Sequence, residues 1–279
     1  MNRSRRIDAH QHFWKYSEEE YGWIGENEGV LKRDFLPDNL SVELSSIGYQ
    51  GSISVQARQT LEETRWLLDL ADNSDHIKGV VGWVDLRSDS LVEQLNEFSK
   101  NKKFKGIRHV VQAEPDDNFI INPDFLNGIS KLENFGLVYE ILIYPKHLKY
   151  ACQMVERFPN QTFVLDHIAK PDIKNHKISE WAEGITKLAA FQNVSVKVSG
   201  MVSEADHEWW KPGDFYPYLD VIWKEFGADR IMVGSDWPVC LPAASYSQVI
   251  CLAEGYFESF SKEVRGKVFG ENAYRIYQL

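Results

Sequence analysis

The sequence predicts an α/β protein, a single (β/α)8 barrel domain that spans residues 1–279. Eight short segments rich in β-branched residues recur along the chain, and most are followed by a stretch with helical spacing, as in a parallel sheet built from βα units. With 279 residues and 43% hydrophobic content, the chain is long enough to bury one large core. No low-complexity segment, internal repeat or Pro/Gly/Ser-rich linker marks a second domain.

The strand-like segments are separated by stretches long enough to hold a helix. In order they are Ile7–His12, Ser52–Ala57, Val80–Asp85, Gly106–Val111, Leu137–Ile143, Phe163–His167, Val194–Ser199 and Ile231–Asp236. Eight parallel strands are the number that closes such a sheet into a barrel. The competing architecture, an open doubly wound sheet, needs a glycine-rich phosphate turn after its first strand, where this chain reads FWKYSEEEYGW.

Helix signals lie between the strand-like segments. Thr60-Leu-Glu-Glu63 and Ser90-Leu-Val-Glu93 are capping-box patterns, in which a hydroxyl and a glutamate satisfy free N–H groups at a helix start. Gly227 is expected to end a later helix before the eighth strand. An apolar face at helical spacing predicts a helix against the barrel wall, formed by Leu148, Ala151, Cys152, Val155 and Phe158.

Composition excludes several kinds of partner. The formal charge is −10 and the Lys and Arg residues are scattered singly, so no nucleic acid is expected to bind. No apolar stretch long enough for a signal peptide or a membrane span follows the basic start MNRSRR. The 3 cysteines show no C-x-x-C spacing, which favours a reducing, cytoplasmic location. A small-molecule substrate is therefore the expected partner, and a homo-oligomer is left open.

His10 and His12 form an H-x-H pattern in the first strand-like segment. Residues two apart in a strand point to the same side, so both imidazoles can face the barrel mouth within reach of one cation. The alternative interpretation is a pair of polar residues on an exposed strand edge.

Asp236 ends the eighth strand-like segment in IMVGSDWP, at the face where barrel enzymes build their active sites. A helix-capping aspartate is the alternative, since Pro238 allows a helix to start at once. Two further strand-like segments also stop at polar clusters, and titratable residues at several strand ends indicate one shared site. These clusters contain Arg108, His109, Asp166 and His167.

Several motifs together resemble the amidohydrolase superfamily, specifically its sugar-lactonase branch of L-fucono- and L-rhamnono-lactonases. They are IDAHQHFW, GWVDL, GIRHVVQ, LDHIAKP and GSDWPV, in this order over nearly the whole chain. The H-x-H and the terminal aspartate occur throughout the superfamily, whereas the succession of the other motifs is more specific. The resemblance implies an amidohydrolase-like barrel.

The resemblance also implies roles for individual residues. His10 and His12 would be metal ligands, with Glu140 at a position often held by a carboxylate. Asp236 would handle the attacking water as general base and could also bind the metal, while His167 would approach the substrate or the metal.

Many superfamily members carry a metal-bridging lysine on the fourth strand, where this chain has Arg108-His109. The expected cofactor is therefore one divalent metal ion, with zinc the first choice, or no metal at all. A cation, or Arg108 with His109 as a donor, could polarise the ester carbonyl during lactone hydrolysis.

The remaining candidates concern the substrate and the other histidines. Trp14, Trp83 and Trp237 follow strand ends and could stack on a sugar, although such tryptophans are as often core residues. Polar partners for substrate hydroxyl or carboxylate groups are Gln56, Tyr144 and Lys170. Surface positions are expected for His76, His147, His176 and His207.

The leading functional hypothesis is thus a hydrolase, acting on a carboxylic ester, that opens a sugar-acid lactone. A metal-dependent decarboxylase or hydratase of a small carboxylic acid is the nearest alternative enzyme. A non-catalytic sugar-binding barrel is a third possibility, which the many titratable candidates at strand ends argue against.

Overall fold

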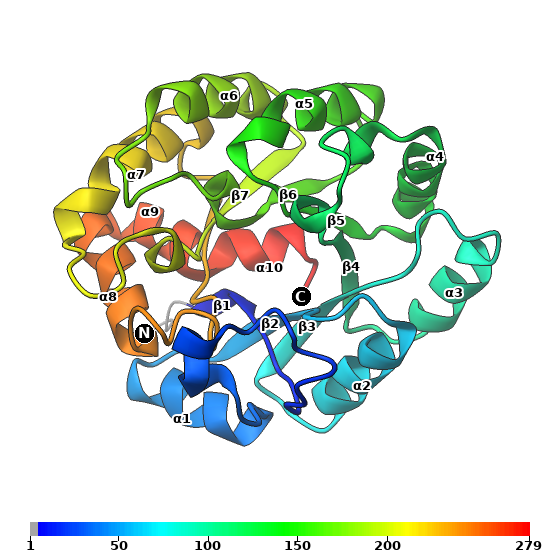
Figure 1. The fold of residues 1–279 in the computed structure, drawn as a ribbon, viewed down its shortest axis with the longest axis horizontal. Coiled ribbons are helices and arrows are strands. Elements are labelled where there is room, and N and C mark those ends of the chain that lie inside the picture. Colours follow the sequence, from blue (N-terminus) through cyan, green and yellow to red (C-terminus); the bar gives the residue numbers. More distant parts are fainter. Residues whose placement is uncertain (1–4) are drawn as a thin grey trace.

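The computed structural model describes residues 5–279 and shows a parallel eight-stranded sheet inside a ring of helices (Figure 1). Residues 1–4, which begin the basic stretch MNRSRR, lie outside the described part of the chain. The strand order follows the sequence. The strands are β1 (Ile7–Gln11), β2 (Gly51–Val55), β3 (Ile77–Gly82), β4 (Phe104–His109), β5 (Val138–Ile141), β6 (Phe163–Leu165), β7 (Val194–Val198) and β8 (Ile231–Val233).

The sheet closes between its first strand and the segment after its last. The Asp236 amide donates to the His10 carbonyl at 2.8 Å, and the His12 amide donates to the Trp237 carbonyl at 2.7 Å. Gly234 makes this approach possible, because a Cβ there would lie 2.6 Å from the Cβ of His10. The open doubly wound alternative is therefore excluded, and the predicted (β/α)8 barrel is confirmed.

Several predicted strand segments run beyond the observed strands at their carboxyl ends. The segment ending at Asp236 leaves the ladder after Val233, and the one ending at Asp85 leaves it after Gly82. The residues beyond these points bend away from the sheet and build the loops at one mouth of the barrel. Composition alone does not mark this transition after β8, because Gly234, Ser235 and Asp236 are buried like the strand itself.

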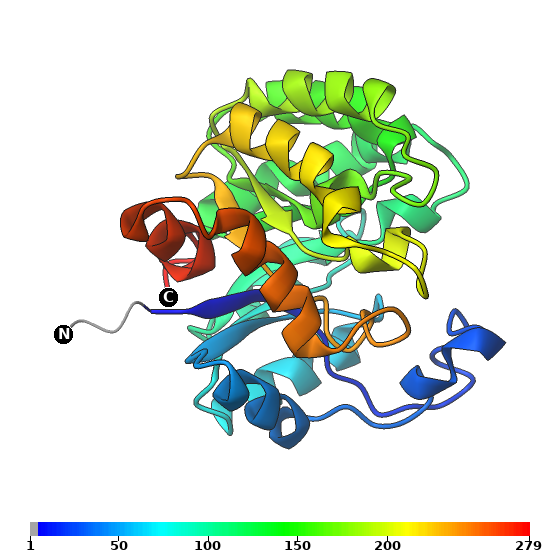
Figure 2. The ribbon, with the colours of Figure 1, turned by 90° about the vertical axis from the view of Figure 1, so that its left-hand side faces the viewer.

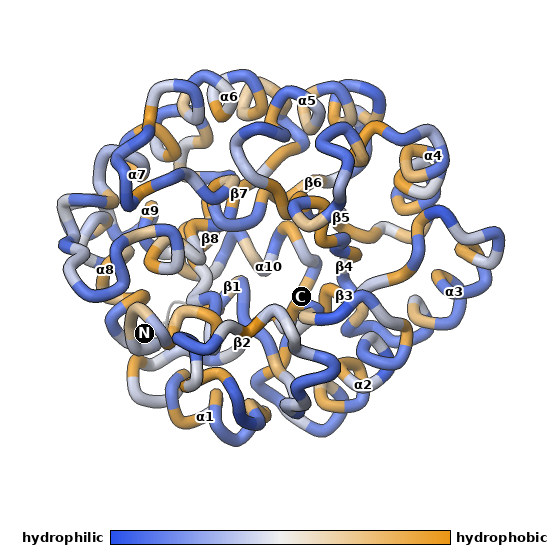
Figure 3. The backbone as a smooth tube through the Cα atoms, viewed as in Figure 1, coloured by the Kyte–Doolittle hydropathy of each residue, from blue (hydrophilic) through white to orange (hydrophobic). Residues whose placement is uncertain are grey.

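Most of the helices surround the barrel, with hydrophilic stretches along their outer rim (Figure 3), whereas the last helix lies across one end of the barrel (Figure 1). They are α1 (Pro37–Ser46), α2 (Leu61–Asp72), α3 (Leu91–Phe98), α4 (Pro123–Leu132), α5 (Leu148–Arg157), α6 (Ser179–Ala189), α7 (Pro212–Phe226), α8 (Tyr246–Phe257), α9 (Lys262–Gly266) and α10 (Asn272–Ile276). Gly227 ends α7 with a φ of 63°, as predicted for a glycine stop.

The capping predictions have different outcomes. Thr60 caps α2, since its side chain accepts from the Glu63 amide, but the Glu63 carboxylate turns to the Ala57 and Arg58 amides instead of completing the box. The predicted cap at Ser90 is wrong: its hydroxyl makes no capping bond and contacts the side chains of Ser88 in the preceding loop and Gln94 in α3.

Two apolar clusters form the core, one between the strands and the helices and one inside the barrel. The inner cluster includes Val138, Val164 and Met232, together with Ile276 and Tyr277 from the end of the chain. The chain end thus closes one mouth of the barrel, at the side opposite the long connection between β1 and α1 (Figure 2). Within residues 5–279, no helix combines the length and the apolar character that a membrane crossing needs.

Candidate active site

Two histidines at the end of β1, His10 within the strand and His12 just after it, stand at the open mouth of the barrel. The Nε2 atoms of His10 and His12 lie 3.1 Å apart, and both side chains are buried. A bulge between Asp8 and Gln11 locally shifts the register of β1 against β2, and such bulges often re-aim side chains beside active sites. The imidazoles point toward one another, as the H-x-H spacing predicts.

Asp236, from the segment after β8 that pairs with β1, and His167, from the segment after β6, complete the cluster. Asp236 Oδ1 lies 3.4 Å from His12 Nε2, 3.7 Å from His10 Nε2 and 3.9 Å from His167 Nε2. Two overlapping groups could hold a metal ion among the described residues, namely His10, His12 and Asp236, and His10, Asp166 and His167.

The donor atoms of the first group suit a tetrahedral ion. Ligand bonds of about 2.0–2.1 Å to zinc place two ligands about 3.4 Å apart, close to the separations seen here. His12 Nδ1 donates to the Val55 carbonyl at 2.8 Å, because a carbonyl oxygen can only accept. That bond leaves the Nε2 lone pair of His12 free for a cation, the usual arrangement of a metal-binding histidine.

The backbone around the cluster adopts an unusual conformation. Four successive residues after β6, His167 to Lys170, have φ between 49° and 61°, and Asp236 has a φ of 57°. Left-handed backbone costs about 1–2 kcal/mol for each non-glycine residue. Gly200 packs against this turn, since a Cβ there would lie 2.6 Å from His167 Nδ1. Unfavourable conformations held in place by packing are typical of functional sites.

A layer of buried charges lies beneath the histidines. Lys197 on β7 is fully buried, and its Nζ lies 2.5 Å from Glu140 Oε1, 3.3 Å from Asp166 Oδ1 and 3.2 Å from His10 Nδ1. Tyr277, from the chain end, donates to the same Glu140 oxygen. The chain end is thereby connected to the charged groups under the site.

Arg108 on β4 joins this layer to the histidines. Its Nε donates to Gln56 Oε1, and its Nη2 donates to both Oε1 and the backbone oxygen of Gln56. Its Nη1 donates to Asp166 Oδ2 at 3.1 Å and lies 3.2 Å from His10 Nε2. Every N–H of the guanidinium therefore faces a protein atom. This geometry makes Arg108 a residue that positions its neighbours, and Gln56 holds the guanidinium in place by accepting its hydrogen bonds.

Burial governs the protonation of the site. It lowers the pKa of His12, and together with neighbouring charges it holds the pKa values of His10 and His167 well below their ordinary value, so these imidazoles are neutral at pH 7. Burial opposes the charge of Asp236, but His167 and the His12 hydrogen bond outweigh it and lower the pKa of that carboxyl. Neutral imidazoles and an ionised carboxylate are the forms that bind a metal.

A family model described as Amidohydrolase matches residues 7–279. This chain belongs to the amidohydrolase family. The predicted resemblance is thus confirmed, over all but the first few residues of the chain.

Relatives of this amidohydrolase carry related names. A protein of Burkholderia multivorans named L-fucono-1,5-lactonase is 39% identical over 98% of this chain and 96% of its own length. A second protein with that name, from Burkholderia ambifaria, is 34% identical with the same coverage of both chains. A solved structure of an amidohydrolase from Burkholderia multivorans with bound zinc has a TM-score of 0.95 and 39% identity, covering 99% of each chain.

Some predicted site residues of the amidohydrolase lie away from the histidine cluster. Glu140 is a member of neither metal-binding group, because Lys197 and Tyr277 engage it below the site. His109 follows Arg108 directly and faces the other side of the strand, where it contacts Glu114 at 2.7 Å and stacks on Phe119. The geometry therefore does not favour Glu140 as a ligand or His109 as a donor to the substrate.

Of the three tryptophans predicted to contact a sugar, two are buried and one is partly exposed. Trp14 and Trp237 are 0% and 2% exposed, and both pack against Phe35, so they support the loops and are not free to contact a sugar. Trp83 is partly exposed and donates to His109. Lys170 and Tyr144 are also partly exposed, and the Lys170 ammonium lies 5.7 Å from the centroid of the Tyr144 ring. Trp83, Lys170 and Tyr144 remain candidates for substrate contact.

Three further expectations are corrected, for His147, His76 and Asp236. His147 is buried, not on the surface, because its ring folds under the turn before α5 and accepts from the Tyr144 amide. His76 is partly buried, whereas His176 and His207 are exposed as predicted. The helix-cap alternative for Asp236 is also wrong, since the side chain faces the histidines and no α-helix begins between Asp236 and Tyr246.

Lys197 is a further residue of the amidohydrolase site, and no sequence motif predicted it. The available signal was a lysine within the apolar strand segment VSVKVS, because a fully buried lysine requires acidic partners.

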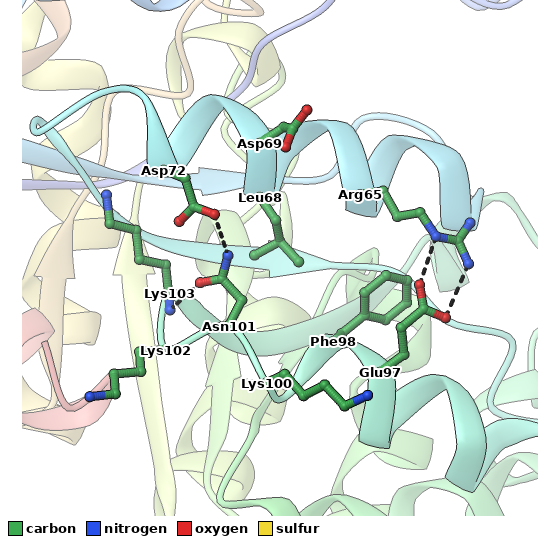
Figure 4. A pocket seen from close by; sticks show the side chains of 10 residues that line it. All are labelled: Arg65, Leu68, Asp69, Asp72, Glu97, Phe98, Lys100, Asn101, Lys102 and Lys103. Atoms are coloured by element: carbon green, nitrogen blue, oxygen red, sulfur yellow. Dashed lines mark hydrogen bonds and ion pairs between the residues drawn. The ribbon is translucent and has the colours of Figure 1, made fainter.

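Another concavity, a groove of about 670 Å³ between α2, α3 and the loop into β4, lies at the opposite end of the barrel (Figure 4). Its Arg65 pairs with Glu97, and no cluster of possible metal ligands lies there among the described residues.

Proposed function

We propose that this amidohydrolase opens a sugar-acid lactone, with L-fucono-1,5-lactone as the first substrate to test. The observation that carries the proposal is the convergence of His10, His12, His167 and Asp236 at the barrel mouth. The names of the two Burkholderia relatives, which align with nearly the whole chain, support the choice of substrate.

We further propose that His10, His12 and Asp236 hold one divalent metal ion, with zinc the preferred candidate. The spacing of their donor atoms and the outward bond of His12 to Val55 support this assignment. When bound, zinc would polarise the lactone carbonyl and lower the pKa of a bound water. Asp166 and His167 are the alternative partners of His10.

Asp236 is the proposed proton acceptor. Its lowered pKa keeps it ionised at neutral pH, and its Oδ1 lies within 3.9 Å of the Nε2 atoms of His10, His12 and His167. It takes a proton as water adds to the lactone carbonyl carbon. The ring C–O bond then breaks, and the proton passes to the departing ring oxygen to give a hydroxy acid. His167, whose Nδ1 contacts Ser199 Oγ at 2.9 Å, is the next candidate for this task.

Partly exposed polar groups at the rim would bind the sugar. Lys170 Nζ lies 3.1 Å from Glu204, and the pair offers a donor and an acceptor next to Tyr144. Such a pair suits the hydroxyl groups of an aldonolactone, because each hydroxyl both donates and accepts. Trp83 would supply an aromatic face.

The test is a proton-release assay with a panel of aldonolactones, run on metal-free protein and with added zinc. The panel contains L-fucono-1,5-lactone, L-rhamnono-γ-lactone and a gluconolactone control. Turnover of a sugar lactone above the spontaneous rate supports the proposal. Tight sugar binding without turnover, or release of CO2 from a carboxylic acid instead, would refute it in favour of the alternatives.

A further inference from the structure

Trp83 is held at both its backbone and its side chain. It directly follows β3, at the carboxyl ends of the strands, where the histidine cluster also lies. The buried Thr64 hydroxyl accepts from the Trp83 amide and donates to the Trp83 carbonyl, both at 2.8 Å. The indole Nε1 donates to His109 Nδ1 at 3.3 Å. Turning this partly exposed ring would therefore break a hydrogen bond.

The two partners of His109 determine which of its nitrogens carries the proton. An indole N–H only donates, so Nδ1 presents its lone pair to Trp83. Nε2 lies 2.7 Å from Glu114 Oε1, and an ionised carboxylate only accepts, so Nε2 carries the proton and donates it to this bond. The opposite tautomer would set two N–H groups against each other at Nδ1 and two acceptors against each other at Nε2. Burial lowers the pKa of His109, which keeps the ring neutral at pH 7.

Aromatic packing fixes the His109 ring itself. The ring stacks on Phe119, with centroids 5.0 Å apart and an interplanar angle of 17°, and meets Phe125 edge-on at 5.4 Å. Phe119 lies in the connection between β4 and α4, and Phe125 lies in α4. Since both nitrogens are bonded and the ring is only 3% exposed, His109 offers the indole an acceptor in a fixed place.

We propose that His109 is a positioning residue for sugar binding, because its bond to the Trp83 indole fixes the aromatic ring against which the sugar packs. The inference rests on the proposed function, in which Trp83 contacts the sugar. A side chain that is already immobile in the free protein loses little conformational entropy when a ligand binds. His109 therefore affects the affinity for the sugar, whereas the bond-breaking steps belong to the histidine cluster.

The first experiment observes the bond itself, without substrate. ¹H–¹⁵N spectra of protein labelled with ¹⁵N-tryptophan and ¹⁵N-histidine are assigned with Trp83→Phe and His109→Phe. Phenylalanine at residue 109 keeps the aromatic packing and offers the indole no acceptor. The expected result is an Nε2–H tautomer for His109, and a Trp83 Nε1–H that exchanges with solvent roughly tenfold faster in His109→Phe than in the wild type. An Nδ1–H tautomer in the wild type, or equal exchange in the two proteins, overturns the proposal.

The second experiment compares KM with kcat for L-fucono-1,5-lactone. His109→Phe should raise KM about three- to tenfold, the effect of one hydrogen bond on an equilibrium, and change kcat by less than about twofold. His109→Asn, whose amide oxygen can replace Nδ1 as the acceptor, should restore most of the affinity. A fall in kcat with unchanged KM contradicts the inference, and so does an asparagine variant that is as impaired as the phenylalanine variant.

A double-mutant cycle tests whether His109 acts through Trp83. Trp83→Phe removes the indole N–H, so adding His109→Phe to it should raise KM no further. Effects that multiply would show that His109 acts independently of Trp83 and would overturn the proposal. A wild-type protein that hydrolyses no sugar lactone refutes the proposed function and the inference with it, whereas wild-type turnover with the same KM in His109→Phe refutes the inference alone.

Discussion

Asp236 occupies a left-handed backbone position, with φ of 57°, in the turn that follows β8. Asparagine adopts this conformation more readily than most residues, since its short polar side chain bonds locally. The backbone bonds that close the barrel, from the Asp236 amide to His10 and from the Cys240 amide to the Asp236 carbonyl, do not involve the carboxylate. A change confined to the side chain therefore separates chemistry from folding at this residue.

Asp236→Asn should fold normally and lose roughly 10²–10⁴-fold in kcat on a sugar lactone, the range expected when a positioned proton acceptor is removed. The measurement is steady-state proton release with zinc in excess, so that weaker metal binding does not limit the rate. Asp38→Asn, at an exposed carboxylate in the first turn of α1, serves as the control. Retained turnover in the Asp236 variant would move the base to His167.

Arg108→Lys should impair both stability and turnover. Lysine keeps the charge but cannot hold Gln56 and Asp166 together with a planar fork. We expect a loss of about 1–3 kcal/mol in the free energy of unfolding, because buried acceptors are left without donors. Urea unfolding measures the first effect and lactone kinetics the second. Wild-type values in both would show that the fork is dispensable.

At the scale of elements, the two capping-box patterns show what sequence can and cannot determine. Thr60 and Ser90 each directly precede a helix and have the same spacing to a glutamate. Only Thr60 has the extended backbone, with ψ of 149°, that aims its hydroxyl at the third residue of the helix; Ser90 has a ψ of 13°. The loop before each helix sets that angle, and nothing in the four-residue pattern encodes the loop.

Thr60→Ala should therefore lower the free energy of unfolding by about 1 kcal/mol, the usual effect of losing an N-cap. Ser90→Ala should have a much smaller effect, since no capping bond is lost. Both values come from urea titrations of the full-length protein. If both variants lose the same free energy of unfolding, the Thr60 capping bond does not contribute to stability.

The start of α2 also predicts a pH dependence. Burial raises the pKa of Glu63 from its ordinary 4.5 to about 7. Between these values the folded state keeps a proton that the unfolded chain has released, so stability falls as the pH rises through this window, by about 3 kcal/mol in total. In Glu63→Gln, whose amide oxygen can still accept from the Ala57 and Arg58 amides, that part of the pH dependence should disappear from unfolding curves. An identical pH profile would show that Glu63 is ionised throughout.

At the scale of the whole molecule, the chain end is part of the support of the site. Tyr277→Phe removes the hydroxyl that donates to buried Glu140, and should lower the free energy of unfolding by about 1.5–3 kcal/mol, as for a bond to a charged group. Tyr139→Phe is the matched control, because that buried hydroxyl has no partner among residues 5–279. A loss as large in the control as in Tyr277→Phe would count against the hydroxyl bond as the cause.

Much of this architecture could be predicted from sequence, because period-two and helical patterns report burial directly. Eight strands, the H-x-H pair and the aspartate after β8 all follow from such patterns. The roles of Glu140 and Lys197 did not, because each depends on which side chain another strand places opposite it. The packing of Trp14 was equally out of reach, since its partner Phe35 lies in a loop with no periodic signal.

The left-handed turn from His167 to Lys170 should respond differently to selection for stability and to selection for activity. Its buried residues Ile168 and Ala169 contribute no side-chain chemistry, and a glycine at Ala169 would relieve the unfavourable backbone angle. A library selected only for resistance to heat should therefore accumulate glycine at residue 169. A library selected for turnover should retain alanine, because the same rigidity that is unfavourable for folding fixes the directions of His167 and Lys170. The two outcomes would reveal, position by position, where this barrel gives up stability to keep its site in place.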